Sequence, residues 1–151
     1  MKNLVFILGS NGYVGNALVK KFLSKDNFVI GIGRSKKSRQ HKERNLKDLK
    51  DSNFQYFSLE DKNIMSLKPQ LINYVTKLNK NSIFINSAWN GCQSISDGSL
   101  TQQFNNVYLS NDAIKLATQI GCDRFLYIGS IFENYIDNFI NNFYILISRC
   151  I

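Results

Sequence analysis

Short, continuously apolar runs alternate along the chain with longer segments in which apolar residues recur every three or four positions. The runs are typical of strands covered on both faces and occupy 4–8, 27–32, 54–57, 82–86 and 124–128. Helical spacing is found in 13–25, 64–78 and 100–120. Pro69 lies inside the second of these segments, so the helix there starts either at its beginning or only near Lys68.

Two of the helical segments predict which side chains face the core. In 13–25 the apolar stripe consists of Val14, Leu18 and Phe22. In 100–120 the stripe consists of Phe104, Val107, Tyr108, Ile114 and Ala117. Gly121 follows the longer segment, at the position where helices commonly end on a left-handed residue.

Strands that are separated by helices, with connections long enough for crossovers, predict an α/β fold with a doubly wound parallel sheet. In such a sheet a ligand binds where the strand order reverses, here at the carboxyl ends of 4–8 and 82–86. The pattern fades after Ser130, so we expect one domain over 1–133 and an incomplete segment over 134–151. Two interpretations of that segment are open. Either the fold is truncated after the fifth strand and the segment stops within an element, or the segment is a buried closing strand.

The first apolar run leads directly into Gly9, Gly12 and Gly15, and the first helical segment follows at once. Glycines permit a tight turn and leave no Cβ between the backbone and a ligand. The free N–H groups at the start of a helix attract negative charge. A strand, this glycine spacing and a helix together predict a seat for the pyrophosphate of a dinucleotide.

Much of the net charge of +8 comes from residues 34–50. A solvated helix with Leu46 and Leu49 as its apolar contacts is favoured there over a surface that binds nucleic acid. A phosphate pocket at the start of the segment is a third interpretation. We expect no nucleic-acid partner.

The three cysteines, Cys92, Cys122 and Cys150, match neither a zinc spacing nor a disulfide framework. We therefore expect no metal site and a reducing compartment. No apolar stretch approaches the roughly 18 residues of a membrane-spanning helix, and the first apolar run is too short for a signal peptide. These features predict a cytoplasmic protein with no membrane partner.

The motifs resemble those of a known family. Gly-Ser-Asn-Gly-Tyr-Val-Gly at 9–15 resembles the GxxGxxG fingerprint of the extended short-chain dehydrogenases/reductases, the NAD-dependent epimerase/dehydratase family. Asn-Ser-Ala-Trp at 86–89, Phe-Asn-Asn-Val at 104–107 and Phe-Leu-Tyr-Ile-Gly-Ser at 125–130 resemble further motifs of this family in the correct order. The Gly-Ser-x-x-Glu that ends at Glu133 is similar to that of sugar-nucleotide members. The resemblance implies a Rossmann-like fold, a dinucleotide cofactor and, in a full-length form, a nucleotide-sugar substrate.

The resemblance also implies roles for individual residues. Those placed on the pyrophosphate or the nicotinamide ribose are Gly9, Asn11, Gly12, Tyr13, Val14, Gly15 and Ala88. Ser130 would donate a hydrogen bond to the substrate oxygen at the reacting carbon, and Asn106 would organise a proton relay. A neutral donor at that oxygen stabilises charge that develops during hydride transfer.

The segment after the second strand bears on the choice of cofactor. Enzymes that use NAD place an acidic residue there to hold the ribose 2′-hydroxyl, whereas this chain has Arg34 followed by Ser35 and two lysines. A guanidinium binds a 2′-phosphate, so NADP(H) is favoured. If Arg34 stacks on adenine instead, NAD(H) remains possible. Ser58 stands where the family often has an adenine-contacting Asp, so that contact would rest on Ser58 and the Leu59 backbone.

The family's catalytic base is the tyrosine of a Tyr-x-x-x-Lys pair, and no such pair follows Ser130 in this chain. We therefore expect a sugar-nucleotide epimerase, dehydratase or reductase fragment that acts by hydride transfer at a sugar carbon, with little or no activity alone. The alternative is a non-catalytic NADP(H)-binding or sensing module that acts through a protein partner. The family's pairing through its long helix implies a possible homodimer through 100–120.

Overall fold

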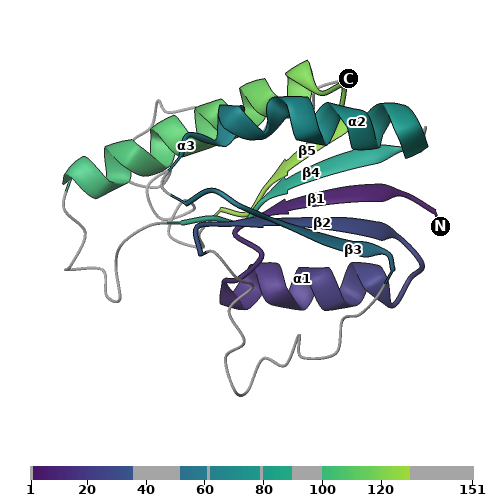
Figure 1. The fold of residues 1–151 in the computed structure, drawn as a ribbon. Helices are drawn as coiled ribbons and strands as arrows, with labels where there is room; N and C mark the ends of the chain where they lie inside the picture. The colour runs from purple at the N-terminus through teal and green to yellow at the C-terminus, as the bar shows by residue number, and fades with distance from the viewer. Residues whose placement is uncertain (1, 36–51, 61, 79, 90–99, 130–151) are drawn as a thin grey trace, which may run out of the picture.

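The computed structural model describes residues 2–35, 52–60, 62–78, 80–89 and 100–129 (Figure 1). The strands are β1 (Leu4–Leu8), β2 (Phe28–Gly33), β3 (Phe54–Ser58), β4 (Ser82–Asn86) and β5 (Arg124–Tyr127). The α-helices are α1 (Tyr13–Leu23), α2 (Lys68–Leu78) and α3 (Leu100–Gln119), and the 3₁₀ helix η1 (Ile64–Leu67) directly precedes α2. The expected helix around Leu46 and Leu49, as well as Ser130 and segment 134–151, lies outside the described residues.

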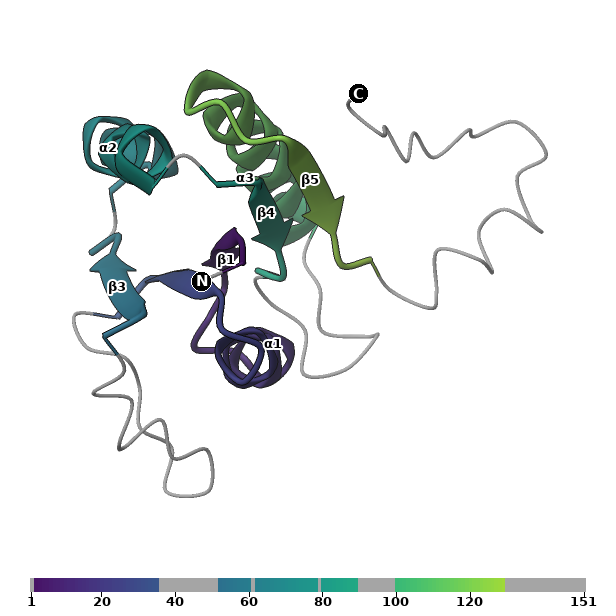
Figure 2. The same cartoon turned by 90° about the vertical axis from the view of Figure 1, so that its right-hand side faces the viewer.

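The five strands form one sheet in the order β3-β2-β1-β4-β5, and every neighbouring pair is parallel. Helix α1 covers one face of this sheet, and α2 and α3 cover the other (Figure 2). The predicted doubly wound α/β fold is therefore confirmed. The strand order reverses between β1 and β4, so the carboxyl ends of these two strands define the expected binding edge.

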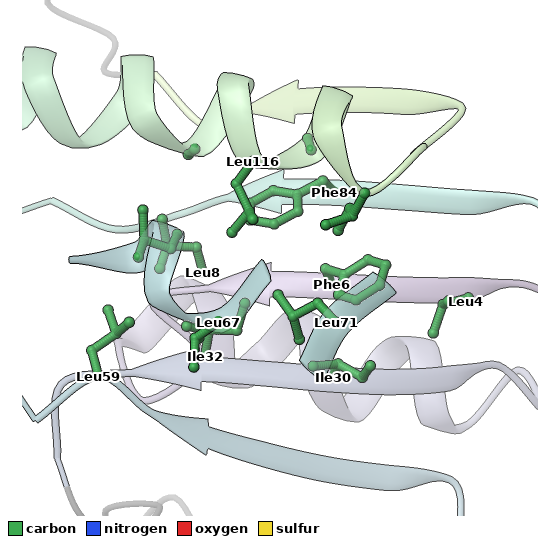
Figure 3. Packing of buried hydrophobic residues seen from close by; sticks show 14 residues of the cluster. Leu4, Phe6, Leu8, Ile30, Ile32, Leu59, Leu67, Leu71, Phe84 and Leu116 are labelled. Carbon is green, nitrogen blue, oxygen red and sulfur yellow. The ribbon is translucent and has the colours of Figure 1, made fainter. Parts of the chain in front are cut away.

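The core lies on both faces of β1, which explains why this strand is continuously apolar. Leu4, Phe6 and Leu8 face the layer of α2 and α3, where they pack with residues such as Leu71 and Leu116 (Figure 3). Val5 and Ile7 belong to a second cluster, which α1 covers through Val19 and Leu23. Alternate residues of a strand point to opposite faces, so both sets must be apolar when both faces are covered.

Helix α2 begins at the later of the two predicted starts. Pro69 is its second residue, where the missing N–H would have no helical partner in any case. The preceding turn is η1, and the Asn63 side chain accepts a hydrogen bond from the Met65 N–H at 2.8 Å. The proline therefore lies in the first turn of α2 instead of interrupting a longer helix.

The predicted stripe of α3 is wrong over the first half of the helix. Phe104, Val107 and Tyr108 are 60%, 63% and 65% exposed. The core is contacted by the second half, through Ala113, Leu116, Ala117 and Ile120. The first half extends past the carboxyl ends of the five described strands, so none of them lies beneath it (Figure 1).

The stripe predicted for α1 also needs correction. Val14 is exposed and Leu18 and Phe22 are half-buried, whereas Val19 and Leu23 are buried. The helix is therefore rotated so that the turn with Gly15 and Asn16 faces inward at its start. By contrast, Gly121 has the left-handed φ of +79° that its position after α3 predicts.

The sequence predicts neither a membrane partner nor a metal site. Within the part of the chain that the structure describes, no helix has the length and apolar character that crossing a membrane requires. Nor do His, Cys, Asp and Glu side chains of those residues gather into a group that could hold a metal ion.

Candidate dinucleotide-binding site

The loop after β1 bends sharply over the end of β2. The N–H groups of Gly9 and Ser10 both donate to the Ile32 carbonyl, at 2.9 and 3.2 Å, and the Ser10 hydroxyl donates to the same oxygen at 3.3 Å. Gly9 has a φ of +83°, which glycine adopts without strain. A Cβ on Gly9 would lie only 2.8 Å from the backbone N and Cα of Ala88. The loop therefore packs backbone to backbone against the segment that follows β4.

The other two glycines set the start of α1 on this loop. The Gly12 N–H donates to the Gly9 carbonyl at 2.8 Å, and the Gly12 carbonyl accepts the first helical bond from Asn16 at 2.9 Å. A Cβ on Gly15 would collide with the Gly9 carbonyl oxygen and lie 2.9 Å from the Ser10 Cα. Only a glycine at position 15 lets the helix rest directly on the turn.

The amino end of α1 has the electrostatics that an anion requires. Gly12 is the N-cap, no side chain caps the helix, and its first turn holds no acidic residue. The positive end of the helix dipole is therefore not offset by an acidic side chain of that turn. Tyr13 and Val14 are exposed at this end, as residues that contact a ligand with their edges or backbone must be.

The carboxyl end of β4 is fixed by hydrogen bonds to β1 and α3. The Ser87 N–H and hydroxyl both donate to the Leu8 carbonyl, at 2.9 and 2.7 Å. The fully buried Asn86 accepts from the Ala88 N–H at 3.0 Å and donates to the Ser110 hydroxyl at 3.2 Å. Asn86 thus holds Ala88 beside Gly9. The sequence signal for this positioning role is an amide at the end of an otherwise apolar strand.

A tyrosine that the sequence analysis did not single out joins the glycine loop to the segment after β2. The Tyr56 hydroxyl on β3 accepts from the Asn11 amide and donates to the Ser35 carbonyl, both at 2.9 Å. Burial raises the pKa of Tyr56 above its ordinary value of 10.0, and the hydrogen bond from Asn11 offsets this only in part. The hydroxyl therefore stays protonated and remains a donor at neutral pH. Arg34 directly precedes Ser35 in the chain and is exposed.

The positions expected at adenine are only partly available. The Leu59 side chain is in the core, and the Leu59 N–H donates to the Gly33 carbonyl at 2.8 Å. The Ser58 hydroxyl and the Asn11 amide oxygen are buried, and within the described segments neither has a hydrogen-bond partner. The Ser58 hydroxyl is therefore unpaired among the described residues but buried, and the backbone donor of Leu59 is already used.

Of the two residues expected to be catalytic, the structure describes only Asn106. Asn106 on α3 is 2% exposed, and its amide donates to the Gln103 side chain at 3.5 Å. Its burial argues against a merely solvated surface amide. Ser130 lies outside the described residues, which end at residue 129, so its role stays a prediction.

Comparisons with known proteins point in one direction. The model of the NAD dependent epimerase/dehydratase family matches residues 5–138. No curated protein matches the chain significantly.

Solved structures that are similar include WbmH from Bordetella bronchiseptica in complex with NAD⁺ (17% identity, TM-score 0.59, covering 87% of this chain and 40% of that one). They also include the yeast methylglyoxal/isovaleraldehyde reductase Gre2 complexed with NADPH (18% identity, TM-score 0.64, covering 84% of this chain and 37% of that one). A third is the UDP-N-acetylglucosamine 4-epimerase from Bacillus cereus (15% identity, TM-score 0.55, covering 83% of this chain and 35% of that one). At these identities the likeness shows a shared fold, and this chain spans less than half the length of each of the three.

Proposed function

Because this chain belongs to the NAD dependent epimerase/dehydratase family, we propose that it binds a nicotinamide dinucleotide across the carboxyl ends of β1 and β4. The observation that carries the proposal is the stacking of three backbone segments without intervening Cβ atoms, with Gly15 on Gly9 and Gly9 on Ala88. This arrangement leaves the uncapped start of α1 facing the strand ends, where backbone N–H groups can bind a pyrophosphate.

The two ends of the cofactor have different surroundings in this proposal. The adenosine lies toward the ends of β2 and β3, near Arg34 and Ser58, and the nicotinamide ribose lies beside Ala88. Arg34 supports NADP(H) as the favoured cofactor, because its guanidinium can bind a 2′-phosphate through two parallel hydrogen bonds. NAD(H) is the alternative, with Arg34 stacked on adenine. Among similar structures, Gre2 is in complex with NADPH and WbmH with NAD⁺.

The substrate class follows from the family and from the Gly-Ser-x-x-Glu motif, which support a nucleotide sugar in a longer form of the protein. The nicotinamide would supply the hydride chemistry, and the protein would supply orientation. Ser130 would donate a hydrogen bond to the substrate oxygen, and Asn106 would hold the proton relay. Because no Tyr-x-x-x-Lys follows Ser130 in these 151 residues, we expect little or no turnover by this chain alone. The second candidate is a non-catalytic NADP(H)-binding module that acts through a partner protein.

A homodimer through α3 is part of the proposal. Phe104, Val107 and Tyr108 are exposed, and their spacing places them on one side of the helix. Contiguous apolar surface of this kind commonly marks an interface. Sedimentation of the chain and of a Tyr108→Glu variant tests this: a dimer that dissociates in the variant supports it, and a monomer in both contradicts it.

Calorimetric titration with NADPH and NADH tests cofactor binding. The Arg34→Gln variant should bind NADPH about tenfold or more weakly and NADH nearly unchanged, since a charged hydrogen bond contributes about 1.5–3 kcal/mol. Lys25→Gln is the matched control: it removes the same charge beyond the other end of α1 and should leave both affinities unchanged. Folded protein that binds neither coenzyme would refute the proposed function. An equal loss for both coenzymes in Arg34→Gln would refute the NADP(H) preference.

A further inference from the structure

Gly33 is the last residue of β2, which is where a dinucleotide-binding domain that selects NAD carries its acidic side chain. A Cβ added to Gly33 would lie 2.6 Å from the Tyr56 hydroxyl oxygen, 3.2 Å from the Asn11 amide nitrogen and 3.4 Å from the Tyr56 Cε2. The last distance is an ordinary van der Waals contact. The obstacle to a side chain at position 33 is therefore the hydroxyl, and the tyrosine ring itself leaves room.

The hydroxyl is not free to move aside. It is held by the hydrogen bonds with Asn11 and Ser35 described above, and both would be lost if it swung away. The ring is fixed by β3, where Tyr56 pairs with Gly31 of β2. The carbonyl of Ser35 would lose its donor in the same movement, and the segment that carries Arg34 would lose its link to the glycine loop.

We infer that Tyr56 is a positioning residue for cofactor selection: its hydroxyl fills the space of an acidic side chain at position 33 and holds Arg34 beside the glycine loop. The ligand feature that is selected is the 2′-phosphate on the adenosine of the dinucleotide. This inference rests on the proposed function and adds the residue that enforces the preference.

The chemistry of the two cofactors explains why this arrangement discriminates. A ribose 2′-hydroxyl is best held by a carboxylate that accepts a hydrogen bond from it, and the Tyr56 hydroxyl excludes a carboxylate at position 33. A 2′-phosphate has only acceptor oxygens when fully ionised, so it needs cations and N–H donors instead. The exposed Arg34 guanidinium next to Gly33 suits the phosphate, and the absence of a side chain at position 33 leaves the hydroxyl without an acidic partner.

The steric step is tested by stability alone, without any cofactor. Gly33→Ala adds only the Cβ and should lower the melting temperature by about 2 °C or more, as overpacking does. In the Tyr56→Phe background the same substitution should cost little, because the oxygen is gone and the ring is in ordinary contact. An Asn11→Ser background is a second route, since it releases one of the two bonds that hold the hydroxyl. An equal penalty for Gly33→Ala in all three backgrounds would overturn the inference.

The selection step is tested by titrating NADPH and NADH into four proteins: the unsubstituted chain, Gly33→Asp, Tyr56→Phe and the double variant. The double variant should bind NADH about tenfold more tightly than Gly33→Asp alone, and NADPH about tenfold more weakly than the unsubstituted chain. If the stability results hold but the double variant keeps the original ratio of affinities, the role in selection is refuted. Failure of the proposed function looks different, because the folded unsubstituted chain would then bind neither coenzyme.

Discussion

Gly15→Ala separates two opposing effects at the base of the candidate site. In an ordinary helix, replacing glycine with alanine stabilises a protein by about 0.5–1 kcal/mol, because alanine loses less backbone entropy on folding. Here the new Cβ would collide with the Gly9 carbonyl oxygen and lie 2.8 Å from the Gly9 carbonyl carbon and 2.9 Å from the Ser10 Cα. All of these are backbone atoms in a hydrogen-bonded turn, so they cannot rotate away as a side chain can.

The collision should outweigh the gain in helix propensity. Overpacking costs about 1–3 kcal/mol, which leaves a net loss of about 0.5–2 kcal/mol after the propensity gain is subtracted. For a chain of this size, that loss corresponds to a melting temperature lower by about 1–8 °C. Thermal unfolding followed by circular dichroism, with the midpoint of urea unfolding as a second measure, tests the value.

Gly12→Ala is the matched control for this prediction. Gly12 has a φ of −73° and is exposed, and its added Cβ would lie 3.2 Å from a single atom, the Gly9 carbonyl oxygen. Its substitution should cost less than about 1 kcal/mol, since alanine is only a poorer N-cap than glycine. If Gly15→Ala is as stable as the unsubstituted chain or more stable, α1 does not rest on the turn as closely as described.

Three further outcomes are expected. Phe84→Ala should lower the free energy of unfolding by about 3–5 kcal/mol, because its buried ring stacks on neighbouring rings at 5.9 and 5.8 Å. Phe104→Ala, made in the Tyr108→Glu background so that no dimer contact contributes, should change it by less than about 0.5 kcal/mol. The backbone N–H of Ser82, and then its hydroxyl, lower the pKa of Asp123 below 3.8. The stabilisation by this carboxylate should be complete above pH 3.8 and should disappear as the pH falls through the lower pKa of the folded state. The urea midpoints of Asp123→Asn and of the parent chain, compared across this pH range, measure it. Burial raises the pKa of Cys122 from 9.0 to about 12, so its alkylation at pH 8 should be about a thousandfold slower than that of an exposed cysteine.

Each of these outcomes has a clear contrary result. Equal losses for Phe84→Ala and Phe104→Ala would contradict the buried aromatic row. A stability difference between Asp123→Asn and the parent that does not shrink in acid would contradict the linkage to Ser82. Cys122 is measured in a Cys92→Ser/Cys150→Ser background, with urea-unfolded protein as the reference. Equal rates in the folded and unfolded protein would contradict its protection.

The sequence predicts the local parts of this fold well. The five strands and the limits of α3 follow from short-range apolar patterns, and Pro69 and Gly121 mark ends through their own backbone restrictions. The side of α3 that faces the core is not local information. Its first half carries a regular apolar spacing but lies beyond the described sheet, and spacing alone cannot reveal that no strand of that sheet lies beneath it.

The candidate site divides in the same way. The glycine loop is contiguous in sequence, so its turn and helix start can be inferred from residues 9–15. Tyr56 could not be identified from the sequence, because its role depends on bonds to Asn11 and Ser35, which are 45 and 21 positions away. A tyrosine in a strand otherwise reads as one more core aromatic.

The contact between Gly9 and Ala88 has a consequence for synthesis on the ribosome. The central strand β1 is translated first, whereas β4, the second of its two neighbours, is translated about 80 residues later. The two strands pair from Leu4 with Ser82 to Leu8 with Asn86. Nascent β1 therefore waits with one edge unpaired while most of the described domain is translated, and such edges are prone to wrong pairing. The bend at Gly9 cannot settle against its partner until codon 88 has been read and the peptide has left the exit tunnel. A dinucleotide in the cell could protect this domain only late in its production, after the strand that completes the seat has emerged.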